Sequence, residues 1–145
     1  MIKMGDIYFA RLKTNSPVQG IQYGIRPVIV ISNNKGNKYS PTVIIVPLTS
    51  KIKKRHMSPH YIVKANIQNG LQRDSVALGE QITTIAKTDL LQKVGELTPF
   101  EIGCVRLAVV FATADDELLE CQSQGADISL LKTCMSAMCN CQQSA

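Results

Sequence analysis

Apolar and polar residues alternate near the N-terminus in a way that predicts a first β-strand. Residues 7–12 show a period of two directly after Gly5-Asp6. Residues 13–25 are rich in glycine, proline and asparagine and predict a loop. Residues 27–33 and 40–50 are two apolar, β-branched runs separated by the turn-type residues 34–37. This arrangement predicts two antiparallel strands joined by a turn.

Shorter strands are predicted at residues 60–64 and 75–82, with a turn at Asn69-Gly70 between them. Residues 86–91 are expected to form one or two helical turns. A helix is predicted from Thr98, because this side chain can accept a hydrogen bond from the Glu101 N–H while Glu101 reaches back. Pro99 fits the first helical position, where its missing N–H costs nothing.

Short antiparallel strands followed by one helix predict a mainly β fold with a C-terminal helix, an α+β protein built on a small barrel. The sequence lacks both the βαβ alternation and the glycine-rich phosphate loop of nucleotide-binding folds. Kinase, NTPase and dinucleotide-dependent functions are therefore excluded.

Composition indicates one folded domain. The 145 residues are 45% hydrophobic and 19% charged, far from the composition of disordered chains. No stretch approaches the roughly 20 apolar residues that a membrane-spanning helix needs, and the N-terminus does not resemble a secretory signal. We expect a cytoplasmic protein without a membrane partner.

Charge divides the chain into two segments. Residues 1–114 contain 15 of the 16 Lys and Arg but 6 of the 11 Asp and Glu, a net charge of +9. Residues 115–145 contain one lysine and five acidic residues, a net charge of −4. We expect a basic domain over residues 1–113 and an acidic extension over 114–145. A basic surface favours a polyanionic partner such as nucleic acid.

Five segments occur in an order that resembles the MazF/PemK toxins of toxin–antitoxin modules. They are Gly5–Ala10, Gly24–Asn33, Gly36–Thr42, Pro47–Lys51 and Asp74–Ile85, and the resemblance covers about residues 2–112. It implies a homodimeric, SH3-like β-barrel of the MazF/PemK/CcdB type with a cognate antitoxin. It further implies an endoribonuclease that cuts single-stranded RNA at short specific sequences without a metal or another cofactor, leaving a 2′,3′-cyclic phosphate and a 5′-hydroxyl.

The resemblance assigns catalysis to Arg26 and Thr49, and both residue types suit the chemistry. Attack of a ribose 2′-hydroxyl on phosphorus requires charge stabilisation and proton transfer at both ends. Arg26 offers a planar fork of donors and precedes Pro27, which restricts its backbone to extended conformations. Thr49 supplies a hydroxyl. Pro47, two residues earlier, predicts a sheet edge or a bulge that re-aims Thr49.

The general base is not assigned by the sequence. A guanidinium stays protonated at neutral pH, so Arg26 suits charge stabilisation and proton donation better than proton abstraction. His56 and His60 are an alternative pair for proton transfer or metal binding. The sequence Met57-Ser58-Pro59 between them argues against a shared helix. Solvated loop residues, which can still touch RNA, are therefore the favoured interpretation.

The expected RNA contacts cluster in two loops and one strand end. The five residues 51–55, which come soon after Thr49, carry four positive charges, which suits a clamp on the RNA backbone. Tyr23 can stack on a base or fold onto the barrel, and Glu80 suits an ion pair. The loop sequence Gly20-Ile-Gln-Tyr-Gly24 lacks an acidic residue and a glycine common in relatives, which puts rate or sequence preference in doubt. The candidate RNA-binding residues are Gln22, Tyr23, Ser50, Lys51, Lys53, Lys54, Arg55, His56 and Gln81.

The extension carries Cys121, Cys134, Cys139 and Cys141, whose spacing matches no zinc site well, so we expect reduced thiols and no bound metal. Apolar residues at helical spacing from Ile128 predict an amphipathic helix that packs on the domain or its dimer partner. The acidic charge also fits a segment that imitates an antitoxin over the RNA groove.

Two other functions remain open at the level of sequence. The same barrel occurs in CcdB-like toxins that poison DNA gyrase by protein contact without hydrolysis. A degenerate, inactive toxin is the third possibility. Arg26, Thr49 and the basic loop favour the nuclease, because a protein-binding poison does not require phosphate-directed groups at a strand end.

Overall fold

The computed structural model describes residues 1–15, 18–51 and 59–114. The extension 115–145, with its predicted helix and four cysteines, lies outside the described residues. The helices and strands are β1 (Asp6–Leu12), β2 (Gly24–Val30), α1 (Asn34–Tyr39), β3 (Thr42–Thr49), β4 (His60–Val63), β5 (Ser75–Leu78), η1 (Gly79–Gln81), β6 (Thr83–Ala86), η2 (Lys87–Asp89), β7 (Leu90–Glu96) and α2 (Pro99–Thr113).

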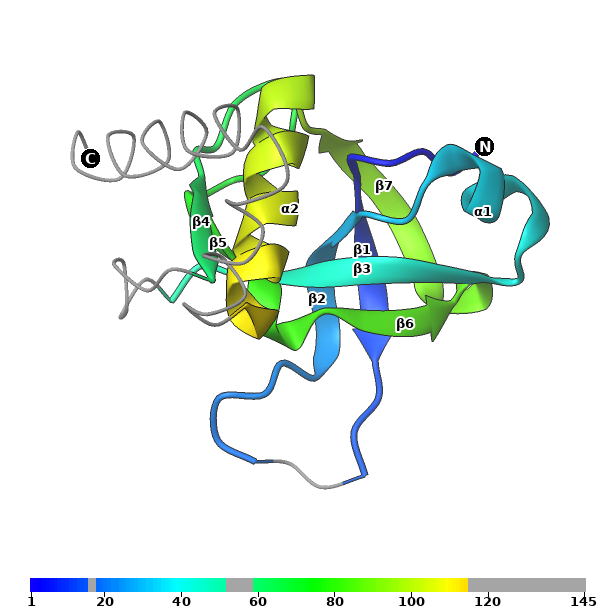
Figure 1. Cartoon of the computed structure of the whole chain (residues 1–145), viewed down its shortest axis with the longest axis horizontal. Helices are drawn as coiled ribbons and strands as arrows, with labels where there is room; N and C mark the ends of the chain where they lie inside the picture. Colours follow the sequence, from blue (N-terminus) through cyan, green and yellow to red (C-terminus); the bar gives the residue numbers. More distant parts are fainter. Residues whose placement is uncertain (16–17, 52–58, 115–145) are drawn as a thin grey trace, which may run out of the picture.

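An antiparallel sheet forms the centre of the described part of the molecule, and α2 lies against one end of it near β4 and β5 (Figure 1). The strand order is β4-β5-β3-β2-β1-β7, and β6 pairs with β3 beside β5. Within the described part, no ladder joins β4 to β7, so the barrel-like sheet is open. The predicted mainly β fold with a C-terminal helix is confirmed.

The central strands are apolar on both faces because each face covers a separate core. Val28, Ile29 and Val30 of β2 are all fully buried. Ile29 packs in a cluster with Val105 and neighbouring residues of α2, whereas Val28 and Val30 belong to a second cluster on the other face of the sheet. This double burial explains why residues 27–33 form a continuous apolar run and do not alternate.

Helix α2 begins with the predicted capping box. The Thr98 Oγ1 accepts the Glu101 N–H at 3.3 Å, and the Glu101 carboxylate accepts the Thr98 N–H at 2.8 Å. These bonds satisfy two amide groups that an uncapped helix leaves without partners.

Residues 34–37 were predicted to form a turn, but they belong to the short helix α1. Asn33 accepts a hydrogen bond from the Gly36 N–H at 2.7 Å and so caps the helix. Asparagine is a favoured N-cap as well as a turn residue. The antiparallel pairing of β2 with β3 is nevertheless confirmed.

The prediction for residues 75–91 is wrong in two places. The strand predicted at 75–82 ends at Leu78, because the 3-10 turn η1 redirects the chain into β6. The helical turns predicted at 86–91 reduce to η2, and β7 follows directly. The sequence hides β7 because its pairing with β1 shifts register twice, which breaks strict alternation.

Pro47 lies in the middle of the sheet, so the expected edge or bulge is wrong. It pairs with Val28 of β2 on one side. On the other side, β3 changes its partner between residues 45 and 48, from β6 to β5. Pro47 falls in that gap, where the ladder on this side is interrupted.

Candidate active site

Arg26 and Thr49 lie on neighbouring antiparallel strands. Arg26 is the third residue of β2, and Thr49 is the last residue of β3. The last paired residues of these strands at this end are Val28 and Pro47. Extending this register by two residues sets Arg26 opposite Thr49. The ladder stops before this point, and both residues line a common space.

That space is a cleft of about 860 Å³. Arg26 and Thr49 line it together with Lys51, and the loop before β2 forms another wall. Gln22, Tyr23 and Gln81 line it as well, so the structure brings together six of the predicted site residues. The cleft is large enough for more than one nucleotide unit, by comparison with ordinary small-molecule sites.

The guanidinium of Arg26 is exposed and has a fixed direction. Its Nε donates a hydrogen bond to the carbonyl oxygen of Tyr23 at 3.1 Å. An arginine has five N–H donors, so this bond orients the group and uses only one of them. Arg26 can therefore present its terminal nitrogen atoms to an anionic ligand in the cleft.

Thr49 is half-buried, and its hydroxyl accepts a hydrogen bond from the Lys51 N–H at 3.2 Å. A hydroxyl that accepts a bond keeps its own hydrogen for donation. This local turn also directs Lys51 into the cleft lining. Ser50 is exposed but does not line the cleft.

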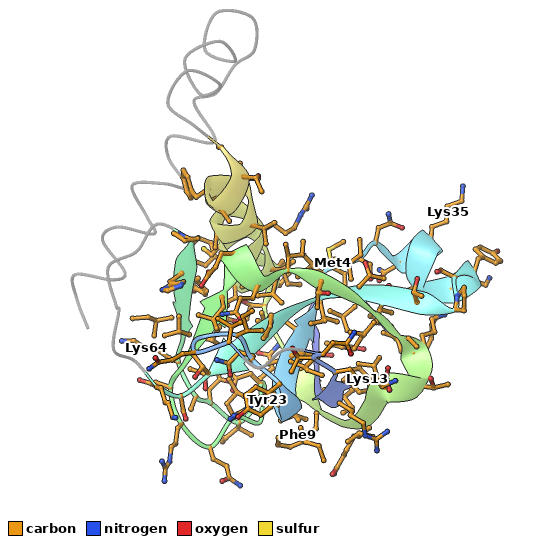
Figure 2. All side chains as sticks on the ribbon, turned by 90° about the horizontal axis from the view of Figure 1, so that it is seen from below. Met4, Phe9, Lys13, Tyr23, Lys35 and Lys64 are labelled. Carbon is orange, nitrogen blue, oxygen red and sulfur yellow. The ribbon has the colours of Figure 1, made fainter. Side chains whose placement is uncertain are left out.

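The loop before β2 projects from the sheet (Figure 1). Tyr23 lies beside the end of β2, far from Lys35 (Figure 2). Tyr23 is half exposed, as base stacking requires. Gln81 reaches this loop: its Oε1 accepts the Gln22 N–H at 2.9 Å, and its Nε2 donates to the Gly20 carbonyl oxygen at 2.7 Å.

His60 and Glu80 form a pair at the edge of the cleft. His60 opens β4 and is only 5% exposed, so it is not a solvated loop residue. Its Nε2 lies 2.8 Å from Glu80 Oε1. Glu80 thus forms its ion pair within the chain when His60 is protonated. Both residues line the cleft.

The rest of the basic loop cannot be placed. Lys53, Lys54, Arg55 and His56 lie outside the described residues. Sequence reasoning did not find Val76 and Leu78, which line the cleft from β5. Apolar strand residues carry no chemical signal, and only the pairing of β5 with β3 brings them beside Thr49.

Within the described ranges, no group of three or more His, Cys, Asp or Glu side chains is arranged to hold a metal ion. Nor does any helix in that part of the chain have the length and apolar character needed to cross a membrane.

The family is shown by comparison of the sequence with known proteins. Residues 3–111 match the family described as PemK-like, MazF-like toxin of type II toxin–antitoxin system. The chain belongs to this family.

Two relatives of this toxin-family chain are named endoribonucleases. It is 39% identical to Endoribonuclease EndoA of Bacillus subtilis (strain 168) over 131 residues, which cover 90% of this chain and 95% of the relative. It is 46% identical to Endoribonuclease MazF of Staphylococcus saprophyticus over 110 residues, which cover 75% of this chain and 88% of the relative.

Solved structures of the family share the fold. Mycobacterium tuberculosis toxin MazF-mt6 matches with a TM-score of 0.60 and 22% identity, over 74% of this chain and 94% of that chain. A mycobacterial endoribonuclease in complex with its cognate antitoxin matches with a TM-score of 0.59 and 25% identity, over 77% and 94% of the two chains.

Proposed function

We propose that this toxin-family chain is an endoribonuclease that cleaves single-stranded RNA in the cleft between β2 and β3. The observation that carries the proposal is that Arg26 and Thr49, both just beyond the last β2–β3 pair, line one cleft. An arginine and a hydroxyl that converge on one open cleft suit a phosphodiester. The endoribonuclease names of the relatives support the same activity.

The proposed reaction is transfer of phosphorus from the 5′-oxygen to the neighbouring 2′-oxygen. The 2′-hydroxyl loses its proton to a base and attacks phosphorus, the bond to the 5′-oxygen breaks, and this oxygen takes up a proton. The products are a 2′,3′-cyclic phosphate and a 5′-hydroxyl. No metal ion or other cofactor is required by this scheme.

Arg26 and Thr49 act on the phosphate in this scheme. The terminal nitrogen atoms of Arg26 donate to the nonbridging oxygens, on which negative charge grows in the transition state. Arg26 also directs a donor toward the leaving oxygen. The Thr49 hydroxyl donates its hydrogen to a second nonbridging oxygen, while Lys51 neutralises an adjacent phosphate.

The partners follow from the same proposal. We expect a homodimer that is inhibited by a cognate antitoxin and acts in the cytoplasm. The mycobacterial endoribonuclease solved with its cognate antitoxin supports the antitoxin as a partner. A gyrase-directed poison has no need of a phosphate-directed pair in a cleft, so the geometry favours cleavage of RNA.

The test is incubation of the purified protein with a long single-stranded RNA in the presence of EDTA, followed by mapping of the cut ends. We expect discrete cuts with cyclic phosphates. Arg26→Ala is expected to reduce the rate about 100- to 1,000-fold, the cost of losing a preorganised oxyanion donor, and Thr49→Val about 10- to 100-fold.

Matched controls separate this chemistry from general damage. Arg106→Ala removes an exposed arginine of α2, and Thr88→Val removes an exposed threonine of η2. Both are expected to cut at the wild-type rate. Intact RNA with the wild-type protein weighs against the proposal and favours a protein-binding toxin or an enzyme inhibited by its own residues 115–145.

A further inference from the structure

Gln81 is placed to hold the loop that carries one wall of the cleft. We infer that Gln81 is a positioning residue, which fixes the loop of residues 18–23 and, through it, Arg26. The anchoring of the loop is argued from hydrogen bonds of the free protein. Its effect on RNA cleavage rests on the proposed function. This inference replaces direct RNA contact as the role of Gln81.

The first step is the geometry of the Gln81 amide. Its oxygen accepts the Gln22 N–H at 2.9 Å, and its nitrogen donates to the Gly20 carbonyl oxygen at 2.7 Å. One side chain thus bonds two backbone groups of a segment about 60 residues earlier in the chain. A donor and an acceptor on one planar group fix the orientation of that segment as well as its distance.

The second step is the conformation of the loop itself. Gly20 and Gly24, on either side of residues 21–23, have φ values of +101° and +76°. A Cβ at either position meets no atom within 4 Å, so the backbone conformation is what requires glycine. Glycine loses much conformational freedom when it is ordered. A loop with glycine at both ends therefore needs further hydrogen bonds to hold a single backbone conformation.

The third step connects the loop to the reacting groups. The Tyr23 carbonyl oxygen, one residue after Gln22, accepts the Nε hydrogen of Arg26 at 3.1 Å. The direction of the guanidinium therefore depends on the position of this carbonyl. Tyr23 is also half exposed, so the loop sets where this ring stands.

The fourth step concerns η1, the 3-10 turn that carries Gln81, and its contacts with the rest of the fold. Gly79 donates its N–H to the Pro59 carbonyl oxygen at 2.8 Å, and a Cβ on Gly79 would lie 2.6 Å from the Ala108 carbonyl carbon of α2. Glu80 bonds His60 at 2.8 Å. Through these contacts, the three residues of η1 connect α2, β4 and the loop of residues 18–23. A positioning group needs such support.

The loop and η1 also form a shared wall between two hollows. A second hollow of about 450 Å³ lies beside the cleft, and both are lined by Ile21, Gln22, Glu80 and Gln81. If Gln81 releases the loop, this wall moves and the cleft changes shape. We therefore expect loss of Gln81 to alter which RNA sequences are cut as well as the rate.

The test compares Gln81→Met with the wild type. Methionine keeps the length of the side chain and removes both hydrogen bonds. In the free protein, hydrogen exchange followed by NMR is expected to lose protection at the Gln22 amide. The Asn37 amide of α1, which donates to the Asn33 carbonyl oxygen away from this loop, serves as an internal reference. With RNA, kcat/KM is expected to fall about tenfold, as two net hydrogen bonds imply, with new cuts at sequences the wild type rejects.

Gln92→Met is the matched control, because Gln92 is an exposed glutamine of β7 outside the cleft lining. It is expected to keep the exchange, the rate and the cleavage pattern of the wild type.

Gln81→Glu gives a readout that a purely structural role would not show. The introduced carboxylate still accepts the Gln22 N–H but opposes the Gly20 carbonyl oxygen. Protonation restores a donor. The ratio of variant to wild-type kcat/KM is therefore expected to rise as the pH falls toward the ordinary glutamic acid pKa of about 4.3.

Each of the following results would overturn the inference. If Gln81→Met lowers kcat/KM while Gln22 exchange is unchanged, Gln81 acts by touching the RNA. If exchange is faster but the rate and pattern of cleavage are unchanged, the loop is held without consequence for catalysis. If the wild type does not cut RNA, the proposed function fails, and unchanged Gln22 exchange would then reject the anchor on its own.

Discussion

Gly79 is held by close backbone contacts, and its replacement is the sharpest test of packing at a single residue. A Cβ there would lie 2.6 Å from the Ala108 carbonyl carbon and 2.7 Å from the Pro59 carbonyl oxygen. Because both are backbone atoms, neither can move aside cheaply. We expect Gly79→Ala to lower the free energy of unfolding by about 1–3 kcal/mol, measured by urea denaturation.

Gly103 provides the matched control, because a Cβ there meets nothing within 4 Å and the residue lies inside α2. Gly103→Ala is expected to raise the free energy of unfolding by about 0.5–1 kcal/mol. Equal effects of the two substitutions would contradict the contact argument.

Asp6 is a buried carboxylate whose partners predict a dependence of stability on pH. It is 1% exposed and lies 2.8 Å from Lys93 Nζ, and it accepts the Lys3 N–H. The hydrogen bond to Asp6 raises the pKa of Lys93 above its ordinary value near 10.5. Burial, followed by the charge of Asp6, raises the pKa of Tyr8.

When the pKa of a group is higher in the folded than in the unfolded state, the group contributes stability at pH values below the unfolded pKa. This stabilisation is lost as the pH rises through the folded pKa. Both shifts therefore predict weaker stability above about pH 10. Lys93→Met is expected to cost about 1 kcal/mol at pH 8, since the lysine is partly exposed and screened, and to flatten the alkaline loss. Urea unfolding at pH 8 and pH 11 measures both, with exposed Lys64→Met as the control. An unchanged alkaline slope in Lys93→Met would reject the pairing.

At the scale of elements, the beginning of α2 depends on its capping box. Thr98→Ala removes the acceptor for the Glu101 N–H and the hydroxyl that donates to the Glu101 carboxylate. We expect the free energy of unfolding to fall by about 1 kcal/mol. Thr88→Ala, at an exposed position in η2, is expected to change it by less than about 0.5 kcal/mol. A smaller effect at Thr98 than at Thr88 would contradict the cap.

Elements with a local signal were predicted from the sequence. The strands at residues 7–12, 27–33 and 40–50 have strong apolar patterns, and Thr98, Pro99 and Glu101 mark the helix. The errors fall where the signal is ambiguous or absent. Residues 34–37 suit a turn and a capped helix equally, and β7 pairs with irregular register.

At the scale of the whole molecule, the acidic extension provides a test of regulation. Residues 115–145 carry a charge of −4 against +9 for the rest of the chain. If the extension imitates an antitoxin over the RNA groove, deletion of residues 115–145 is expected to raise RNA cleavage severalfold at low salt, with a smaller effect at high salt because charge attraction is screened. Unchanged or lower activity would reject this idea. The result can be interpreted only if the shortened chain keeps the circular dichroism spectrum and the Tm of the full chain.

The sequence alone determined the antiparallel strand pattern, the start of the last helix, the family and the identity of Arg26 and Thr49 as candidates. These depend on local periodicity, capping and ordered motifs, which the chain carries without its fold. The tertiary structure decided that Arg26 and Thr49 line one cleft beyond the β2–β3 ladder, that His60 is buried against Glu80, and that Gln81 bonds a loop from far along the chain. Pairings between distant segments depend on packing that no local pattern encodes.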